Sequence, residues 1–62
     1  MKDTLFEEAK KYAIKNQKIS ASLLQRYLQI GYSRSAMILD QLEETGIVGP
    51  AIGAKPRKIL IK

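Results

Sequence analysis

The sequence predicts a mostly helical α+β domain in which three helices are followed by a two-stranded β-hairpin. Apolar residues recur at helical spacing in three stretches before Gly46. After Gly46, two short apolar runs are separated by a loop that contains Gly53. A chain of 62 residues has room for one small domain, so we expect residues 1–62 to form a single unit.

The first helix is expected from residue 4 or 5 to about residue 15. Thr4 and Glu7 have the spacing of a capping box, in which each side chain bonds the backbone N–H of the other residue. Residues 16–18 interrupt the helical pattern and predict a short connection. The apolar stripe of this helix consists of Leu5, Phe6, Ala9, Tyr12 and Ala13.

A second, shorter helix is expected from about Ser20 to Gln29. Ser20 is a suitable N-cap, and Ile19 and Leu24 have the spacing of a hydrophobic staple around it. Gly31 is placed to stop the helix, because glycine accepts the left-handed conformation that helix ends often need. The predicted apolar face consists of Leu23, Leu24, Tyr27 and Leu28.

The third helix is predicted to begin at Ser33 as its N-cap and to end at Gly46. The small side chain of Ser35 lies on the apolar face, where it allows close approach to the second helix. That face consists of Ser35, Ile38, Leu39 and Leu42. The opposite face carries Ser33, Arg34, Met37, Asp40, Gln41 and Glu44.

The remaining residues predict a hairpin. Ile47–Val48 reads as a short strand, which Pro50 confines to a brief or edge position because proline cannot donate to a ladder. Residues 51–55 form the predicted loop, and residues 58–61 form the returning strand. Two short helices joined by a glycine-containing turn and followed by a hairpin predict a winged helix-turn-helix fold.

Composition limits the function. Eleven Lys and Arg against six Asp and Glu give a net charge of +5, which favours a polyanionic partner, nucleic acid before membrane. The chain has no Cys and no His, so we expect no disulfide, metal or cofactor, and no nucleophile or base for an enzyme. It has no phosphate loop of an ATPase and no apolar run that spans a membrane. A cytoplasmic protein is the expectation.

The start of the third helix has the residues expected of a DNA-reading helix. Such a helix contacts base edges with residues near its N-terminus, here Ser33, Arg34, Met37 and Gln41. Arginine bonds guanine O6 and N7 together, and glutamine does likewise on adenine. Methionine can make only apolar contact, for example with a thymine methyl group. An alternative places Met37 against Tyr32 as a hydrophobic staple.

Basic and polar residues elsewhere extend this predicted interface. Lys55 and Arg57 flank Pro56 in the wing loop, where they can reach phosphates or a minor groove. Gln25 and Arg26 on the second helix are placed to contact the DNA backbone. For the wing cations, the alternative is a solvated loop.

Four segments together resemble the gamma domain of the FtsK/SpoIIIE DNA translocases: Ser22–Arg26, Ile30–Tyr32, Glu43–Pro50 and Lys55–Arg57. The similarity extends from about residue 5 to residue 60. The resemblance implies a C-terminal winged-helix domain of a hexameric motor. It also implies recognition of short, polarised chromosomal sequences that orient translocation, and activation of a tyrosine recombinase. A nucleoid-associated protein of the bacterial cytoplasm is the expected setting.

The predicted reading helix departs from the family pattern. The family often has Arg at the positions of Tyr27, Gln29 and Met37, and Asn at the position of Ser33, whereas Arg34 matches. The resemblance therefore implies the family's scaffold but not its target sequence. A rival prediction is a winged-helix module that binds a recombinase or another protein and has weak DNA affinity. A small stand-alone DNA-binding regulator is a further alternative.

Overall fold

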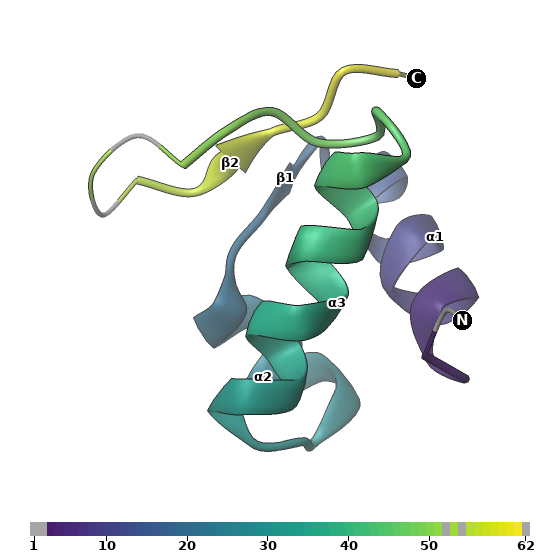
Figure 1. Cartoon of the computed structure of the whole chain (residues 1–62), viewed down its shortest axis with the longest axis vertical. Helices are drawn as coiled ribbons and strands as arrows, with labels where there is room; N and C mark the ends of the chain where they lie inside the picture. Colours follow the sequence, from purple (N-terminus) through teal and green to yellow (C-terminus); the bar gives the residue numbers. More distant parts are fainter. Residues whose placement is uncertain (1–2, 52, 54, 62) are drawn as a thin grey trace.

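The computed structural model describes residues 3–51, 53 and 55–61 and confirms three helices followed by an antiparallel hairpin (Figure 1). Within the expected 51–55 loop, residues 52 and 54 lie outside the described residues. The elements in chain order are α1 (Phe6–Asn16), β1 (Lys18–Ile19), α2 (Ala21–Leu28), α3 (Tyr32–Glu44) and β2 (Arg57–Lys58).

The hairpin is the wing of the predicted fold. Val48 forms an antiparallel bridge with Ile59, and the N–H of Gly49 donates to the carbonyl of Lys58 at 2.9 Å. The outgoing segment is shorter than a regular strand, as the proline at position 50 predicts.

The sheet contains a strand that the sequence did not predict. Residues 18 and 19 were expected as connection and staple, but they form β1, which pairs antiparallel with β2. Ile19 lies opposite Arg57 and is fully buried. Two residues are too few to show the alternation of a strand, so only the distant partner reveals β1.

The core lies where the three helices and the small sheet meet. Its fully buried large side chains are Ile19, Leu24, Ile38, Leu42 and Val48. Ser35 is buried among them, and its hydroxyl donates to the carbonyl of Gly31 at 3.0 Å. A small residue whose only polar atom is bonded lets α3 pack closely without an unsatisfied group.

The expected capping box at α1 is wrong. The N-cap is Leu5, which makes no side-chain cap bond. The Asp3 carboxylate instead accepts the N–H of Leu5 at 2.8 Å, and the Asp3 carbonyl accepts the N–H of Phe6 at 3.0 Å. The Thr4 hydroxyl is turned to Arg34 of α3, so a tertiary contact replaces the local cap.

The junction between α2 and α3 also differs in its details. The Ser20 N-cap is confirmed, since its hydroxyl accepts the N–H of Leu23 at 3.1 Å. However, α2 ends at Gln29, whose φ of 54° is left-handed, rather than at Gly31. Gly31 is the N-cap of α3, so the predicted Ser33 cap is wrong. Gln29 adopts the left-handed conformation although it is not glycine.

The end of α3 at Gly46 is confirmed. Gly46 has a φ of 80°, and its N–H donates to the carbonyl of Glu43. The N–H of Ile47 donates to the carbonyl of Leu42, which completes a Schellman motif. Ile47 and Leu42 are both buried, so this turn directs the chain from α3 into the hairpin.

Candidate nucleic-acid interface

The solvent-facing side of α3 is divided into two halves of different charge. The first turns expose Tyr32, Ser33 and Met37 and contain no acidic residue. The last turns expose Asp40, Glu43 and Glu44 and contain no basic residue. A phosphate backbone can approach the first half without repulsion, whereas the second half repels it.

The alternative placement of Met37 as a staple is wrong. Because Gly31 is the N-cap, the staple positions around the start of α3 are Ile30 and Ser35. The Met37 side chain is 45% exposed and lies outside the buried core. Its side chain is therefore available to a ligand, and its contact with a base remains a prediction.

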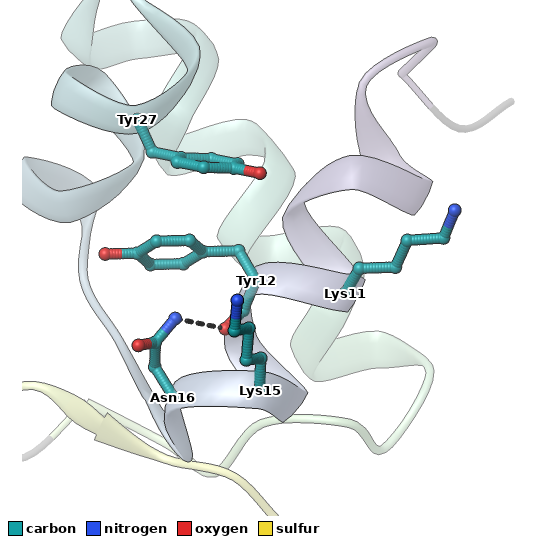
Figure 2. A pocket seen from close by; sticks show the side chains of 5 residues that line it. All are labelled: Lys11, Tyr12, Lys15, Asn16 and Tyr27. Carbon is teal, nitrogen blue, oxygen red and sulfur yellow. Dashed lines mark hydrogen bonds between the residues drawn. The ribbon is translucent and has the colours of Figure 1, made fainter.

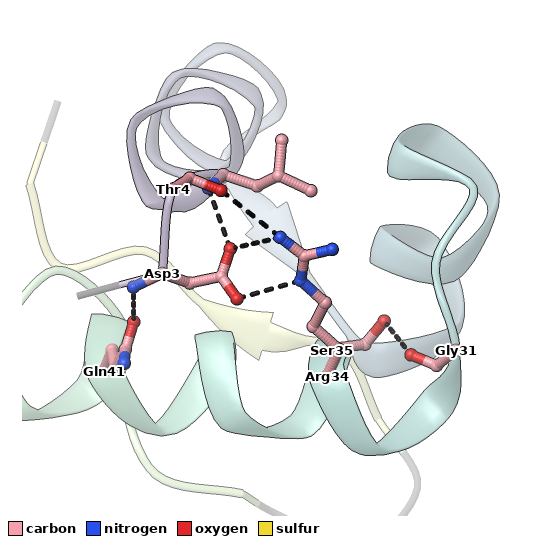
Figure 3. Close-up of polar contacts among 7 residues, drawn as sticks. Asp3, Thr4, Gly31, Arg34, Ser35 and Gln41 are labelled. Atoms are coloured by element: carbon pink, nitrogen blue, oxygen red, sulfur yellow. Dashed lines mark hydrogen bonds and ion pairs between the residues drawn. The ribbon is translucent and has the colours of Figure 1, made fainter. Parts of the chain in front are cut away.

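Arg34 is held by the segment that precedes α1 (Figure 3). Its Nε donates to Asp3 Oδ2 at 2.9 Å, and its Nη2 donates to Asp3 Oδ1 at 2.9 Å. Nη2 also approaches the Thr4 hydroxyl at 3.3 Å. The hydrogen bond from Arg34 and the one from Leu5 N–H lower the pKa of the Asp3 carboxyl. One edge of the guanidinium is therefore occupied by an intramolecular carboxylate.

Gln41, another predicted base-reading residue, contacts the same aspartate. The backbone N–H of Asp3 donates to Gln41 Oε1 at 3.0 Å (Figure 3). Arg34 and Gln41 are seven residues apart, so they share the flank of α3 that faces the start of α1. Ser33 and Met37 lie further round the helix, on its solvent-facing side.

The wing places one free and one paired cation beside α3. Lys55 is exposed and has no ion pair among the described residues. The Arg57 Nη1 donates to Glu43 Oε1 at 2.7 Å, and its side chain is only 16% exposed. A groove of about 420 Å³ separates the wing residues 55–57 from Tyr32 and from the start of α2 at residues 20–22.

The two predicted residues of α2 lie apart from this groove. Gln25 is half-buried and Arg26 is exposed in the last turn of α2. Neither residue lines the groove between α2, α3 and the wing. The structure therefore brings together the wing and the start of α3, and it leaves Gln25 and Arg26 outside that assembly.

Comparison with known sequences identifies the family. The Ftsk gamma domain family matches residues 1–62. The chain belongs to the FtsK gamma domain family.

Three curated relatives are each named DNA translocase FtsK. The protein of Streptococcus pyogenes serotype M1 is 53% identical over 58 residues, which are 94% of this chain and 7% of that protein. The protein of Chlamydia muridarum is 53% identical over 60 residues, 97% of this chain and 8% of that protein. The protein of Chlorobaculum tepidum is 48% identical over 61 residues, 98% of this chain and 8% of that protein. The gamma domain therefore spans less than a tenth of the length of these relatives.

The structure shows a second surface of this gamma domain that its sequence did not predict. Tyr27 was predicted as a core residue of α2, but it is 50% exposed, and its ring centroid lies 4.3 Å from that of Tyr12 on α1. Lys11, Lys15 and Asn16 border the two rings around a hollow of about 270 Å³ (Figure 2). The hydroxyl groups of Tyr12 and Tyr27 could have indicated this placement in the sequence. A tyrosine side chain has a polar end, so it is favoured at the edge of a core rather than at its centre.

Two classes of site are not found in the described part of this gamma domain. Its acidic side chains form no cluster that could hold a metal ion. None of its described helices is long and apolar enough to cross a membrane.

Proposed function

We propose that this gamma domain binds double-stranded DNA in a sequence-dependent way and orients a DNA translocase on the chromosome. The relatives carry the name DNA translocase FtsK, and this domain accounts for 7–8% of their length. In this proposal the rest of such a protein forms the hexameric motor, and the gamma domain recognises the DNA sequences that set the direction of translocation. The setting is the bacterial cytoplasm, at the nucleoid.

One observation carries the proposal: the acid-free start of α3 lies beside a groove bordered by the wing cations. Tyr32, Lys55 and Arg57 line the same groove, together with the start of α2. A helix that enters the major groove needs its first turns free of acids, and cations beside it to neutralise phosphates. The net charge of +5 supports the same partner.

The residues divide into three roles. Ser33 and Met37 face solvent from the first turns of α3 and are proposed to contact base edges. Lys55 is proposed to contact phosphate, as are Gln25 and Arg26 at the periphery. Arg34, Gln41 and Arg57 form the third group, because each of them already makes a hydrogen bond within the protein. These bonds use part of the hydrogen-bonding capacity that each side chain could offer to DNA.

Selection from a random duplex library tests the proposal. The selected duplex and a shuffled duplex of equal length are then titrated with the domain at low salt. We expect the selected duplex to bind more tightly and both affinities to fall as salt rises. Absence of binding to every duplex at low salt would refute DNA binding by this domain. Equal affinity for both duplexes would refute the sequence dependence alone.

The acidic half of α3 favours a second role, contact with a basic protein such as a tyrosine recombinase. Asp40 and Glu44 are exposed and have no ion pair among the described residues. Since they repel phosphates, they are available to a protein while the start of α3 contacts DNA. Asp40→Lys with Glu44→Lys should abolish recombinase binding in a pull-down and leave the fold intact. Recombinase binding that survives both changes would remove this role from α3.

A further inference from the structure

Asp3 contacts α3 with both its side chain and its backbone. The carboxylate receives two hydrogen bonds from Arg34, each 2.9 Å long, and the backbone N–H donates to Gln41 at 3.0 Å (Figure 3). The same carboxylate accepts the N–H of Leu5 at the start of α1. Asp3 therefore joins the start of α1 to two positions of α3 that lie about two turns apart.

The Asp3 side chain is almost inaccessible, with 7% of its surface exposed, whereas Arg34 is 43% exposed. A carboxylate with so little contact with water depends on its protein partners for solvation. Its three hydrogen bonds have fixed directions, and a bidentate arginine–carboxylate pair is the most directional ion pair available to a protein.

The apolar contacts between α1 and α3 are less directional than these bonds. The buried residues of α1 are Phe6, Ala9 and Ala13, and the two alanines have short side chains that allow small adjustments of the contact. Burial of Ile38, Leu39 and Leu42 keeps one face of α3 in the core. The directional polar bonds along the Asp3 flank then set the remaining small rotation of α3 about its own axis.

We propose that Asp3 is a positioning residue for DNA recognition, setting the rotation of α3 through Arg34 and Gln41 so that Ser33 and Met37 face the duplex. This inference rests on the proposed function. Contacts with base edges require side chains held within fractions of an ångström, and such precision depends on a surrounding shell of supporting bonds. Asp3 affects specificity without touching DNA.

The pairing also limits what Arg34 does. Its Nε–Nη2 edge is occupied by Asp3, and its charge is balanced by the carboxylate. Among the described contacts, Nη1 has no partner. Release from Asp3 frees a cation for any nearby phosphate, which raises binding to all sequences alike. Loss of Asp3 should therefore lower discrimination while it preserves or raises affinity.

Asp3→Asn tests the proposal, with Glu8→Gln as the matched control. Both variants remove one negative charge at nearly constant size, and Glu8 is exposed without an ion pair among the described residues. The ratio of affinities for the library-selected and shuffled duplexes is measured well below the melting temperature. We expect Asp3→Asn to lower this ratio about fivefold, the lower end of the effect of one mismatched base pair. Glu8→Gln should leave the ratio unchanged.

A second measurement needs no DNA. Residual dipolar couplings of backbone amides give the orientation of α3 relative to α2, and we expect Asp3→Asn to rotate α3 while α2 keeps its couplings. Unchanged couplings in α3 would overturn the proposal, whatever the DNA result. Rotated couplings with an unchanged affinity ratio would overturn the link to specificity. If the unaltered domain binds no duplex, the proposed function fails by itself, and the couplings still decide whether Asp3 positions α3.

A double-mutant comparison separates positioning from a general loss of stability. If Asp3 acts through Arg34, the change in affinity ratio for Asp3→Asn combined with Arg34→Ala should equal that for Arg34→Ala alone. Additive changes in the ratio would show that Asp3 acts by another route and would overturn the assignment.

Discussion

The guanidinium of Arg57 lies 2.7 Å from the carboxylate of Glu43, so an ion pair joins the wing to the last turns of α3. The pair orients the wing relative to α3, and it balances part of the charge of Arg57. Lys55, which is exposed and has no ion pair among the described residues, is then available to neutralise a phosphate. Because Arg57 is paired and Lys55 is not, substitutions of these two wing residues should have different effects.

Lys55→Ala should weaken binding to selected and shuffled duplexes by the same factor. Its slope of log K against log salt should be less steep by about 0.9, the contribution of one phosphate contact. The melting temperature should not change, because Lys55 is exposed. Lys15→Ala on α1 is the control and should leave the slope unchanged. A loss confined to the selected duplex would instead make Lys55 a base contact.

Glu43→Gln should raise affinity for every duplex, because it releases the charge of Arg57 and removes a carboxylate near DNA. The pair is partly exposed, so unfolding should become easier by no more than about 1 kcal/mol. Glu44→Gln removes the same charge without a partner and should have the smaller effect on affinity. Equal gains in both variants would show that the released Arg57 contributes nothing. Titration and thermal melting measure both quantities.

Met37→Arg should raise affinity and create a preference for guanine at one base pair, since arginine can bond O6 and N7. The Met37 side chain is nearly half exposed, so the melting temperature should stay within a few degrees. Met37→Gln is the control, because it adds hydrogen bonding without charge and should favour adenine. Repeated library selection with each variant reads out the preference. An unchanged selected sequence would place Met37 outside the base-reading surface.

The Asp3–Arg34 pair should make the stability of the folded domain depend on pH in the acidic range. The pKa of Asp3 is lowered from its ordinary value of 3.8, chiefly by the hydrogen bond from Arg34. A lowered pKa contributes stability above the ordinary value and loses it as the pH falls through the folded-state value. Relative to Asp3→Asn, the unaltered domain should therefore melt higher at pH 6, and this difference should shrink below pH 3.8. A difference that is constant with pH would show that the carboxylate charge does not stabilise the fold.

Gly46→Ala should destabilise the domain by about 1 kcal/mol, because alanine is strained at a φ of 80°. For a domain of this size, that corresponds to a fall of roughly 4–8 °C in melting temperature. Nothing lies within 4 Å of a Cβ at this position, so strain and not collision is the cause. Gly46→Asn should be milder, since asparagine tolerates the left-handed region. Equal losses would point to another cause.

The sequence predicted the helices because their periodicity is local. The stripe through Ile38, Leu39 and Leu42 is buried as expected, and Ser35 is buried with them. The Ser20 cap and the Gly46 stop were also predictable, because each depends on residues within one turn. The wing was predictable from Pro50 and from the short apolar runs on either side of the loop.

The errors arose where a distant residue replaces a local partner. Thr4 had the spacing of a cap, but its hydroxyl lies near Arg34, 30 residues away. Strand β1 exists only through its pairing with β2 at the far end of the chain. Likewise, the sequence predicted that Arg34 and Gln41 contact bases from the third helix, but it contained no sign that Asp3 contacts both residues.

The register of β1 and β2 places Lys18 directly opposite Lys58, and both side chains are exposed. Like charges at facing strand positions repel each other, and dissolved ions weaken that repulsion. Added salt should therefore weaken this repulsion between the two strands, and under the proposed function it should also weaken binding to DNA. The same ions also screen the Asp3–Arg34 and Glu43–Arg57 pairs. A thermal melt at each salt concentration therefore shows whether loss of DNA at high ionic strength reports the interface or the fold.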